Sequence, residues 1–275
     1  TANPTSNWSR KFGRTGQENR SIYLDKTLPR EACYLSNKIV PSNSKSMKSA
    51  QVVSFFLSQL MLVHFCFAGK DSEYTEAITE SKPDRYWSFD SHSPSKNVES
   101  SGGPTSPEYP AFGKINSAVK MKNGGHVTIT DPGKDSVFDF DNGDEITVEA
   151  MVSLDQLRDQ AAILTKGRTN NAGFAANNQN WAFRLKSTNG GQAGVNFLFR
   201  SKGTKDQPAD WHRWTSNKGF TVGDGWHHIA ISYRFGDPES IRAYLDGKPV
   251  QGKWDMGGPT ESPPIVDDDE VWIGS

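Results

Sequence analysis

The residues from Trp226 to Lys248 read WHHIAISYRFGDPESIRAYLDGK, and apolar side chains recur there at every second position in two runs. This two-residue period is typical of a β-strand and not of a helix. A Gly-Asp-Pro break separates the runs, and the second run ends at Asp246-Gly247, a dipeptide typical of tight turns. Because two strands alone are unstable in water, the pattern predicts a larger antiparallel sheet around them. The residues expected to share one side are Ile229, Ile231, Tyr233, Ile241, Ala243 and Leu245.

This stretch closely resembles the W-H-H-V-A-V-T-Y…Y-[IV]-D-G signature of laminin-G-like modules, which have the concanavalin A-type jelly-roll fold. Three further motifs of that family match in order, at Ile146–Val152 (ITVEAMV), Ile163–Gly167 (ILTKG) and Val271–Ser275 (VWIGS). The resemblance is closest to the modules of large secreted bacterial multidomain proteins. It implies an all-β fold, a sandwich of two antiparallel sheets, over roughly residues 84–275.

Length and composition favour one domain of sandwich size with additional segments. The chain has 275 residues and a formal net charge of −1, and it is 34% hydrophobic with 25 Gly and 15 Pro. Short strands joined by Gly/Pro turns have this composition, whereas helical bundles do not. The near-zero charge argues against a nucleic-acid partner. Because Cys33 and Cys66 precede the matched region, we expect neither a disulfide nor thiol chemistry in the domain.

The first 69 residues are expected to lie outside the folded domain. Residues 1–46 are polar and without period, so we expect a disordered or non-native extension. Residues 47–69 have a basic start, an apolar run and small residues at its end, which indicates a signal peptide cleaved after Ala68 or Gly69. A transmembrane anchor is disfavoured, because polar residues interrupt the run and no basic cluster follows. We therefore expect a secreted, periplasmic or cell-surface protein with no membrane partner after cleavage.

Residues 70–83 are predicted to be an acidic linker, and 84–275 to be the laminin-G-like sandwich, opened by a strand at Arg85–Asp90. The chain stops at Ser275, in what the resembled family has as a late strand. We therefore expect a C-terminally truncated fragment whose sandwich lacks its last strand and keeps one unpaired edge.

Two local patterns complete the expected fold. Residues 92–109 are rich in Ser, Pro and Gly and are predicted to be a loop. Residues 115–122 and 126–130 are predicted to be two strands, and Asn123-Gly124-Gly125 between them predicts a hairpin turn.

Catalysis has little support in the sequence. Glucanases on the resembled fold use an E-x-D-x-E strand, whose two-residue spacing aims carboxylates into one cleft. Here Glu145 and Glu149 share a side, but Thr147 stands where the aspartate should be, and the acidic run at 267–270 precedes its strand. No serine or cysteine nucleophile motif occurs in the domain. We expect a protein that is not an enzyme.

The sequence offers only isolated residues as possible metal ligands. His227 and His228 are adjacent in a strand and so point to opposite faces, which favours a structural His bonded to a neighbouring carbonyl. The resemblance makes Ca²⁺ a candidate ligand, held by loop carboxylates such as Asp237, Asp246 and Asp267–Asp269. Their spacing is not diagnostic, so we assign no certain cofactor and no metal ligand set.

Candidate glycan contacts concentrate where Trp residues adjoin charged residues, because indole faces stack on sugar rings and charged side chains bond hydroxyls. Trp211 and Trp214 have opposite parity in a strand, so at least one should lie at the surface, while packing in the core is the alternative for each Trp. Lys202, Lys205 and Arg213 nearby favour an acidic or sulfated polysaccharide. The candidate set is Trp181, Asp210, Trp211, His212, Arg213, Trp214 and Trp254.

These observations predict a non-catalytic extracellular carbohydrate-binding or adhesion module of a larger secreted protein, with a polysaccharide or glycan as its partner. An alternative is a structural domain that binds another extracellular protein domain and has no sugar site. A diverged glycoside hydrolase is the third candidate.

Overall fold

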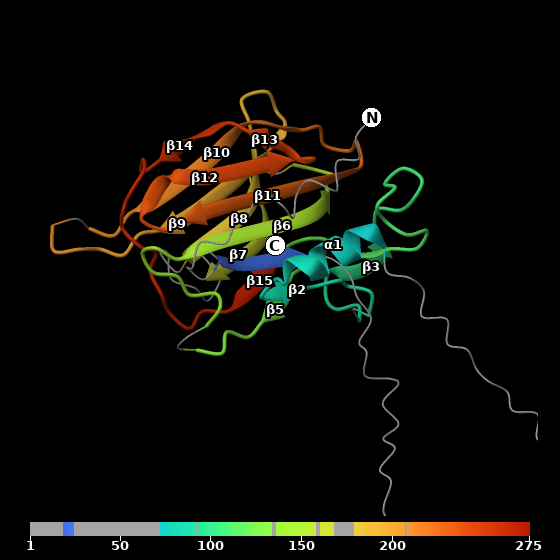
Figure 1. The fold of residues 1–275 in the computed structure, drawn as a ribbon, viewed down its shortest axis with the longest axis horizontal. Coiled ribbons are helices and arrows are strands. Elements are labelled where there is room, and N and C mark those ends of the chain that lie inside the picture. The colour runs from blue at the N-terminus through green and yellow to red at the C-terminus, as the bar shows by residue number, and fades with distance from the viewer. Residues whose placement is uncertain are drawn as a thin grey trace, which may run out of the picture. The chain divides into compact units, whose positions relative to one another are not determined.

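The computed structural model describes residues 72–91, 93–133, 136–157, 160–167, 179–206 and 208–275, and the backbone of 19–24. The predicted signal peptide and both cysteines lie outside these residues. Within them, two large β-sheets stack face to face, with β6, β11 and β12 nearer the viewer in Figure 1. The predicted β-sandwich is therefore confirmed.

The first sheet contains the hairpin from which the sequence analysis began. Its strand order is β13-β12-β11-β6-β1-β2, and β6, β11, β12 and β13 pair antiparallel. β1 runs parallel to both of its neighbours. The strands span Lys248–Val250 (β13), Asp237–Leu245 (β12), Trp226–Arg234 (β11), Glu145–Ser153 (β6), Asn19–Leu24 (β1) and Arg85–Tyr86 (β2).

The second sheet is antiparallel throughout and has the order β14-β10-β9-β8-β7-β15-β5. Its strands span Gly252–Met256 (β14), Trp211–Phe220 (β10), Ala193–Arg200 (β9), Gln179–Ser187 (β8), Gln160–Gly167 (β7), Val271–Ile273 (β15) and Val127–Ile129 (β5). A separate two-stranded sheet pairs β3 (Val98–Gly102) with β4 (Ser117–Met121).

The core lies between the two large sheets and is rich in aromatic rings. On the first sheet, the predicted inward residues Ile229, Ile231 and Tyr233 are all buried. From the second sheet, Phe197 and Phe199 meet the Tyr233 ring with centroids 5.7 and 5.8 Å apart. Other inward residues are Ile146, Val148, Ala150, Trp181, Phe183, Leu185, Val195, Trp214, Ala243 and Val271.

The N-terminal part differs from the expectation in two places. Asn19–Leu24, within the segment predicted to be an extension without strands, forms β1 and pairs with β6. The predicted linker contains helix α1 (Glu73–Ser81), which Ser72 caps by accepting a hydrogen bond from the Thr75 backbone. α1 is anchored rather than free, because Thr75 and Ile78 are buried and Tyr74 stacks on Phe112.

The predicted hairpin at Asn123-Gly124-Gly125 is wrong. The turn itself forms, with the amide of Gly125 donating to the Lys122 carbonyl at 2.8 Å. However, β4 pairs with β3 and β5 pairs with β15, so the two strands leave the turn for different sheets. β3 also corrects the interpretation of residues 92–109 as a loop.

A largely buried ion cluster ties β7 to the loop before β6. The Lys166 ammonium has no exposed surface, and its Nζ donates to Asp131 Oδ2 at 2.7 Å and also to Asp139 Oδ1. Burial raises the pKa of the Asp139 carboxyl, and the hydrogen bond from Lys166 opposes this rise. Because the charges are removed from water, each depends on its partners.

No helix among the described residues is long and apolar enough to cross a membrane.

Candidate functional site

The seven-stranded sheet turns a polar face away from the core, which we call the outer face. Each strand alternates, so inward Phe197 and Phe199 on β9 leave Asn196, Leu198 and Arg200 on the other side. The strand register places the outward residues of neighbouring strands side by side. These residues are Asn180, Ala182, Arg184, Lys186, Asn196, Leu198, Arg200, Trp211, Arg213, Thr215, Lys253 and Asp255. Six of them, Asn180, Ala182, Arg184, Asn196, Leu198 and Thr215, are buried.

A hydrogen-bonded network crosses the outer face from β7 to β14. Buried Arg184 donates from Nη1 to Gln160 and from Nε to Asn196 Oδ1 at 2.9 Å. Asn196 donates onward to Thr215 Oγ1 at 2.8 Å. Thr215 donates to Asp255 Oδ2 at 3.1 Å, and Arg213 Nε donates to Asp255 Oδ1 at 2.7 Å. The network fixes polar side chains of five strands in one arrangement.

Trp211 lies between two arginines at the end of this network, a group that we call the Trp211 platform (Trp211, Arg200 and Arg213). Arg200 is its cross-strand partner on β9. Arg213 follows two residues later on the same side, about 6.7 Å along the strand. Gly257 (φ 68°) allows the chain after β14 to approach, because a Cβ there would lie 1.7 Å from the Trp211 backbone oxygen. The half-buried indole is thus held at the sheet surface with cations on two sides.

A second aromatic side chain stands on the outer face near the opposite edge of the sheet. Trp272 on β15 pairs in register with Thr165 and Thr128, and its Nε1 donates to Glu270 at 3.0 Å. His126 stacks on the indole with centroids 3.5 Å apart. Four strand spacings separate β15 from β10, roughly 19 Å. The outer face therefore carries aromatic rings toward both of its edges.

Four of the residues predicted to bind a ligand point inward instead. Trp181 is 1% exposed and donates from Nε1 to the Phe138 carbonyl at 2.9 Å. Trp214 is buried in the core, and Trp254 packs edge-on to Tyr233. His212 is buried, with Nδ1 2.9 Å from the Gly258 carbonyl oxygen and Nε2 3.1 Å from Ser201 Oγ. These side chains support the sandwich and offer no face to a ligand.

The other three predicted residues lie at the surface. Trp211 and Arg213 share the outer face, as the opposite parity of Trp211 and Trp214 requires. Asp210 is exposed, and its Oδ1 accepts the Trp211 amide at 2.7 Å. Sequence reasoning missed Arg184, Asn196, Thr215 and Asp255. Alternation along β9 indicates that Asn196 faces outward, but the pairings across strands leave no periodic trace in the sequence.

The outer face is cationic although the whole chain has a formal charge of −1. Asp255, at the bulge of β14, is the one carboxylate among the outward residues named above. Four cationic side chains of the same set are at least partly exposed, those of Lys186, Arg200, Arg213 and Lys253. The charge of this face therefore favours an anionic ligand.

His227 forms a second charged group at the start of β11. Its Nδ1 lies 2.9 Å from Asp246 Oδ2 and its Nε2 2.8 Å from Asp224 Oδ1, and the ring stacks on Phe220. The predicted partner, a carbonyl, is therefore replaced by two carboxylates. Burial lowers the pKa of His227, but the hydrogen bonds to Asp246 and Asp224 outweigh it, and the pKa is raised above its ordinary value of 6.5.

This raised pKa gives a pH-dependent prediction. The folded state binds the His227 proton more tightly than the unfolded chain, so the contribution to stability is complete below pH 6.5. It is lost as the pH rises through the higher folded pKa. We expect the difference in unfolding free energy between the native chain and His227→Phe to shrink above pH 6.5. Urea unfolding over a pH series measures this, and Asp224→Asn should lower the His227 pKa in an NMR titration. A native His227 pKa below 6.5 would contradict it.

The predicted calcium ligands do not converge. Asp237 and Asp246 stand at opposite ends of β12, and both oxygens of Asp246 accept hydrogen bonds, from His227 and from the His228 amide. Asp267 Oδ1 accepts the Asp269 amide at 3.1 Å. Among the described residues, no three His, Cys, Asp or Glu side chains group to hold a metal ion. Calcium therefore stays a prediction from the sequence.

The two glutamates weighed for catalysis lie on β6, away from the outer face of the second sheet. Glu145 pairs with Arg234, and Glu149 Oε2 lies 3.5 Å from His228 Nε2. Both partners come from β11, the neighbouring strand. The two carboxylates are therefore engaged in separate cross-strand pairs.

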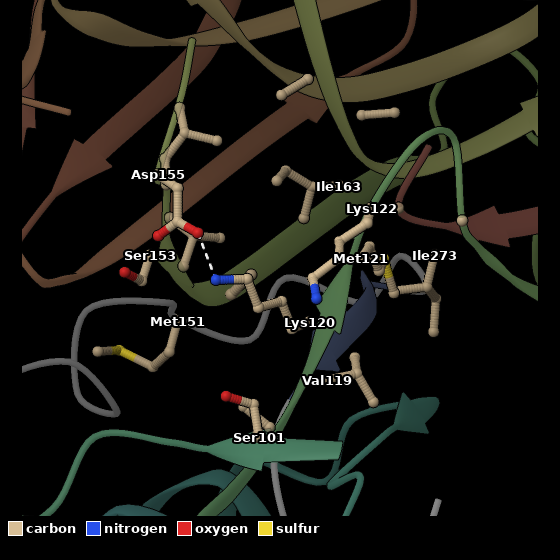
Figure 2. Close-up of a pocket in the computed structure, with 18 of the residues that line it drawn as sticks. Ser101, Val119, Lys120, Met121, Lys122, Met151, Ser153, Asp155, Ile163 and Ile273 are labelled. Carbon is tan, nitrogen blue, oxygen red and sulfur yellow. Dashed lines mark hydrogen bonds and ion pairs between the residues drawn. The ribbon is translucent and has the colours of Figure 1, made fainter. Parts of the chain in front are cut away.

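A pocket of about 890 Å³ lies elsewhere, between β4 and the ends of β6 and β7. Met121, Met151, Ile163 and Ile273 contribute apolar surface to it. Figure 2 shows the Lys120 side chain reaching toward Asp155, with which it forms an ion pair. The hydrogen bond to Asp155 raises the pKa of Lys120. This pocket is mainly apolar, unlike the outer face.

Two stacked, mainly antiparallel sheets are typical of jelly-roll sandwiches. Among solved structures, the chain is similar to an endo-β-1,4-glucuronan lyase from the fungus Trichoderma reesei, with 11% identity and a TM-score of 0.40 over 67% of this chain and 78% of the lyase. It is also similar to the Emp47p carbohydrate recognition domain, with 12% identity and a TM-score of 0.31 over 67% of this chain and 89% of that domain. A search of curated proteins returned no match.

The family model Laminin_G_3, described as the concanavalin A-like lectin/glucanases superfamily, matches residues 121–275. The chain belongs to this superfamily, which confirms the resemblance drawn from the Trp226–Lys248 stretch.

Proposed function

We propose that the protein is an exported, non-catalytic carbohydrate-binding module and that its binding surface is the part of the outer face around Trp211, where Trp211, Arg200 and Arg213 are partly exposed. The observation that carries the proposal is the Trp211 platform, an indole at the sheet surface between Arg200 and Arg213. The sequence at residues 47–69 supports export.

The chemistry of the outer face fits a sugar chain. A pyranose ring stacks its C–H groups on an indole, while guanidinium and amide groups donate to its hydroxyls. The buried residues Asn196 and Thr215 hold Asp255, and Asp255 holds Arg213, in place before a ligand arrives, which lowers the entropic cost of binding.

The carboxylates considered for catalysis already have partners, which supports binding without turnover. Glycosidases need two carboxylic groups that flank one bond. Glu145 and Glu149 are each paired with a β11 residue. On the outer face, both oxygens of Asp255 accept hydrogen bonds, from Arg213 and Thr215. Asp255 thus serves to orient its neighbours. Among the outward residues of β8, β9, β10 and β14 named above, there is no second carboxylate.

A polysaccharide screen tests the proposal. The full chain is run by affinity electrophoresis through gels that contain neutral or anionic polysaccharides, and the same polysaccharides are assayed for reducing-sugar release. We expect retardation by at least one polysaccharide and no release. Release that disappears in Glu149→Gln would instead support a diverged glycoside hydrolase.

A second function, a structural domain that binds another extracellular protein domain, is favoured by one observation. The apolar lining of the β4–β6 pocket, including Met121 and Met151, suits protein side chains better than sugar hydroxyls. A screen without any bound polysaccharide, together with a partner domain whose affinity falls in Met151→Lys, would favour this function over the first.

A further inference from the structure

We propose that Arg213 is the specificity-determining residue of the outer face and that it binds the carboxylate of a uronic-acid sugar whose ring stacks on Trp211. This inference rests on the proposed function and names the class of sugar that the face selects.

The hydrogen bonds of Arg213 prepare it for this role. Its Nε donates to Asp255 Oδ1 at 2.7 Å, and the other oxygen of Asp255 accepts from Thr215. Arginine carries five N–H donors in a planar fork, so the bond from Nε leaves both terminal NH₂ groups. No other side chain among the described residues forms an ion pair with Arg213. Asp255 is therefore a positioning residue that fixes the plane of the guanidinium.

The position of Arg213 fits a substituted sugar on the indole. Two residues along one strand place Arg213 about 6.7 Å from Trp211, so a ring stacked on Trp211 directs a substituent toward the guanidinium. A planar carboxylate accepts two parallel N–H bonds from the terminal groups of arginine, which a hydroxyl cannot do. Arg213 is about four-fifths buried (side chain 18% exposed), so a pair formed there is only partly screened by solvent.

The charge of the face supports the same class. Four partly or fully exposed cationic side chains, those of Lys186, Arg200, Arg213 and Lys253, accompany the one carboxylate of Asp255 among the outward residues of β8, β9, β10 and β14. Arg200, across from Trp211, adds a cation on the other side of the indole. A neutral glucan would gain nothing from this charge, whereas a polyuronate would be attracted along its length.

The test compares polygalacturonate with its methyl ester, which has the same backbone without the charge. Binding of the full chain is measured by isothermal titration calorimetry at 0.15 M and 0.3 M NaCl. We expect the native chain to bind the acid about 10- to 150-fold more tightly than the ester, the range given by hydrogen bonds to a charged group. Arg213→Ala should remove this preference. Arg213→Lys, which keeps the charge but loses the planar fork, should keep only part of it.

Matched controls separate a specific site from general attraction. Lys253→Ala removes a cation of the same face outside the Trp211 platform and should reduce the preference much less than Arg213→Ala does. Dextran sulfate against dextran distinguishes a sulfate site from a carboxylate site. Urea unfolding of each variant shows whether the fold is retained, and Arg213→Lys serves if Arg213→Ala does not fold.

The outcomes are distinct. Equal binding of acid and ester overturns the inference and leaves the proposed function in place. A preference for dextran sulfate alone, or an equal loss in Lys253→Ala and Arg213→Ala, also overturns it. No binding to any polysaccharide overturns the proposed function itself.

Discussion

Replacing Lys166 by alanine is expected to destabilise the sandwich by about 3–5 kcal/mol, the cost of breaking a buried ion group by removing one partner. Lys166 and Asp131 have no exposed side-chain surface, and Asp139 is 14% exposed. Without the ammonium, the Asp131 and Asp139 carboxylates lose the cation that both of them bind. Urea unfolding of the native chain and of the variant at neutral pH measures the loss.

A matched variant separates this charge effect from lost packing. Lys166→Met combined with Asp131→Asn and Asp139→Asn removes all three charges while it keeps similar volume. Because uncharged replacements of a whole buried ion group are often neutral, this variant should recover most of the stability lost in Lys166→Ala. If it is as unstable as Lys166→Ala, the lost stability comes from the shape of the Lys166 side chain and not from its charge.

Trp211→Ala is expected to lower the affinity for a bound polysaccharide by a factor of roughly 30 or more, the range of an aromatic hot spot. The indole supplies the stacking surface of the Trp211 platform, and Arg213 cannot replace it. Trp211→Phe keeps an aromatic face and should lose less. Because Trp211 is half-buried at the surface, neither change should reduce the unfolding free energy as strongly as a core substitution.

A control on the other sheet identifies the face that binds. Tyr244 lies on β12 in the six-stranded sheet, where Ala230 is its cross-strand partner. Tyr244→Ala removes an aromatic ring of comparable exposure and should leave the affinity unchanged. An equal loss in Tyr244→Ala and Trp211→Ala would place the binding surface elsewhere.

Alternation along single strands predicted the core well. Ile229, Ile231 and Tyr233 are buried as expected, because side chains of a strand alternate between the sheet faces whatever the strand pairs with. The turn at Asp246-Gly247 was also predicted from its residues, and both adopt positive φ, 48° and 76°. Alternation also predicted that Trp211 and Trp214 face opposite sides of the sheet, and the structure shows that Trp214 is the inward one.

Pairing between distant segments could not be predicted in the same way. Asn123 and Gly124 form the expected turn, but the Asn97 carbonyl accepts the Lys122 amide and β4 pairs with β3 instead of β5. α1 was missed because only Thr75 and Ile78 are buried on it, too few for a helical pattern.

The candidate site depends both on alternation within single strands and on pairing between distant strands. Trp181 and Trp254 were selected by residue type, although Trp181 shares its parity with core residues Phe183 and Leu185, and this indicates an inward side chain. Thr215 and Asp255 are 40 positions apart in the sequence, so only the β10–β14 pairing brings them together.

Hydroxyl-radical footprinting of the full chain with and without a bound polysaccharide tests the central claim most directly, because radicals oxidise exposed Trp and Met side chains. Binding on the outer face predicts that oxidation of Trp211 falls while oxidation of Met121 and Met151, at the β4–β6 pocket, stays the same. Protection of Met121 and Met151 with unchanged oxidation of Trp211 would contradict the account.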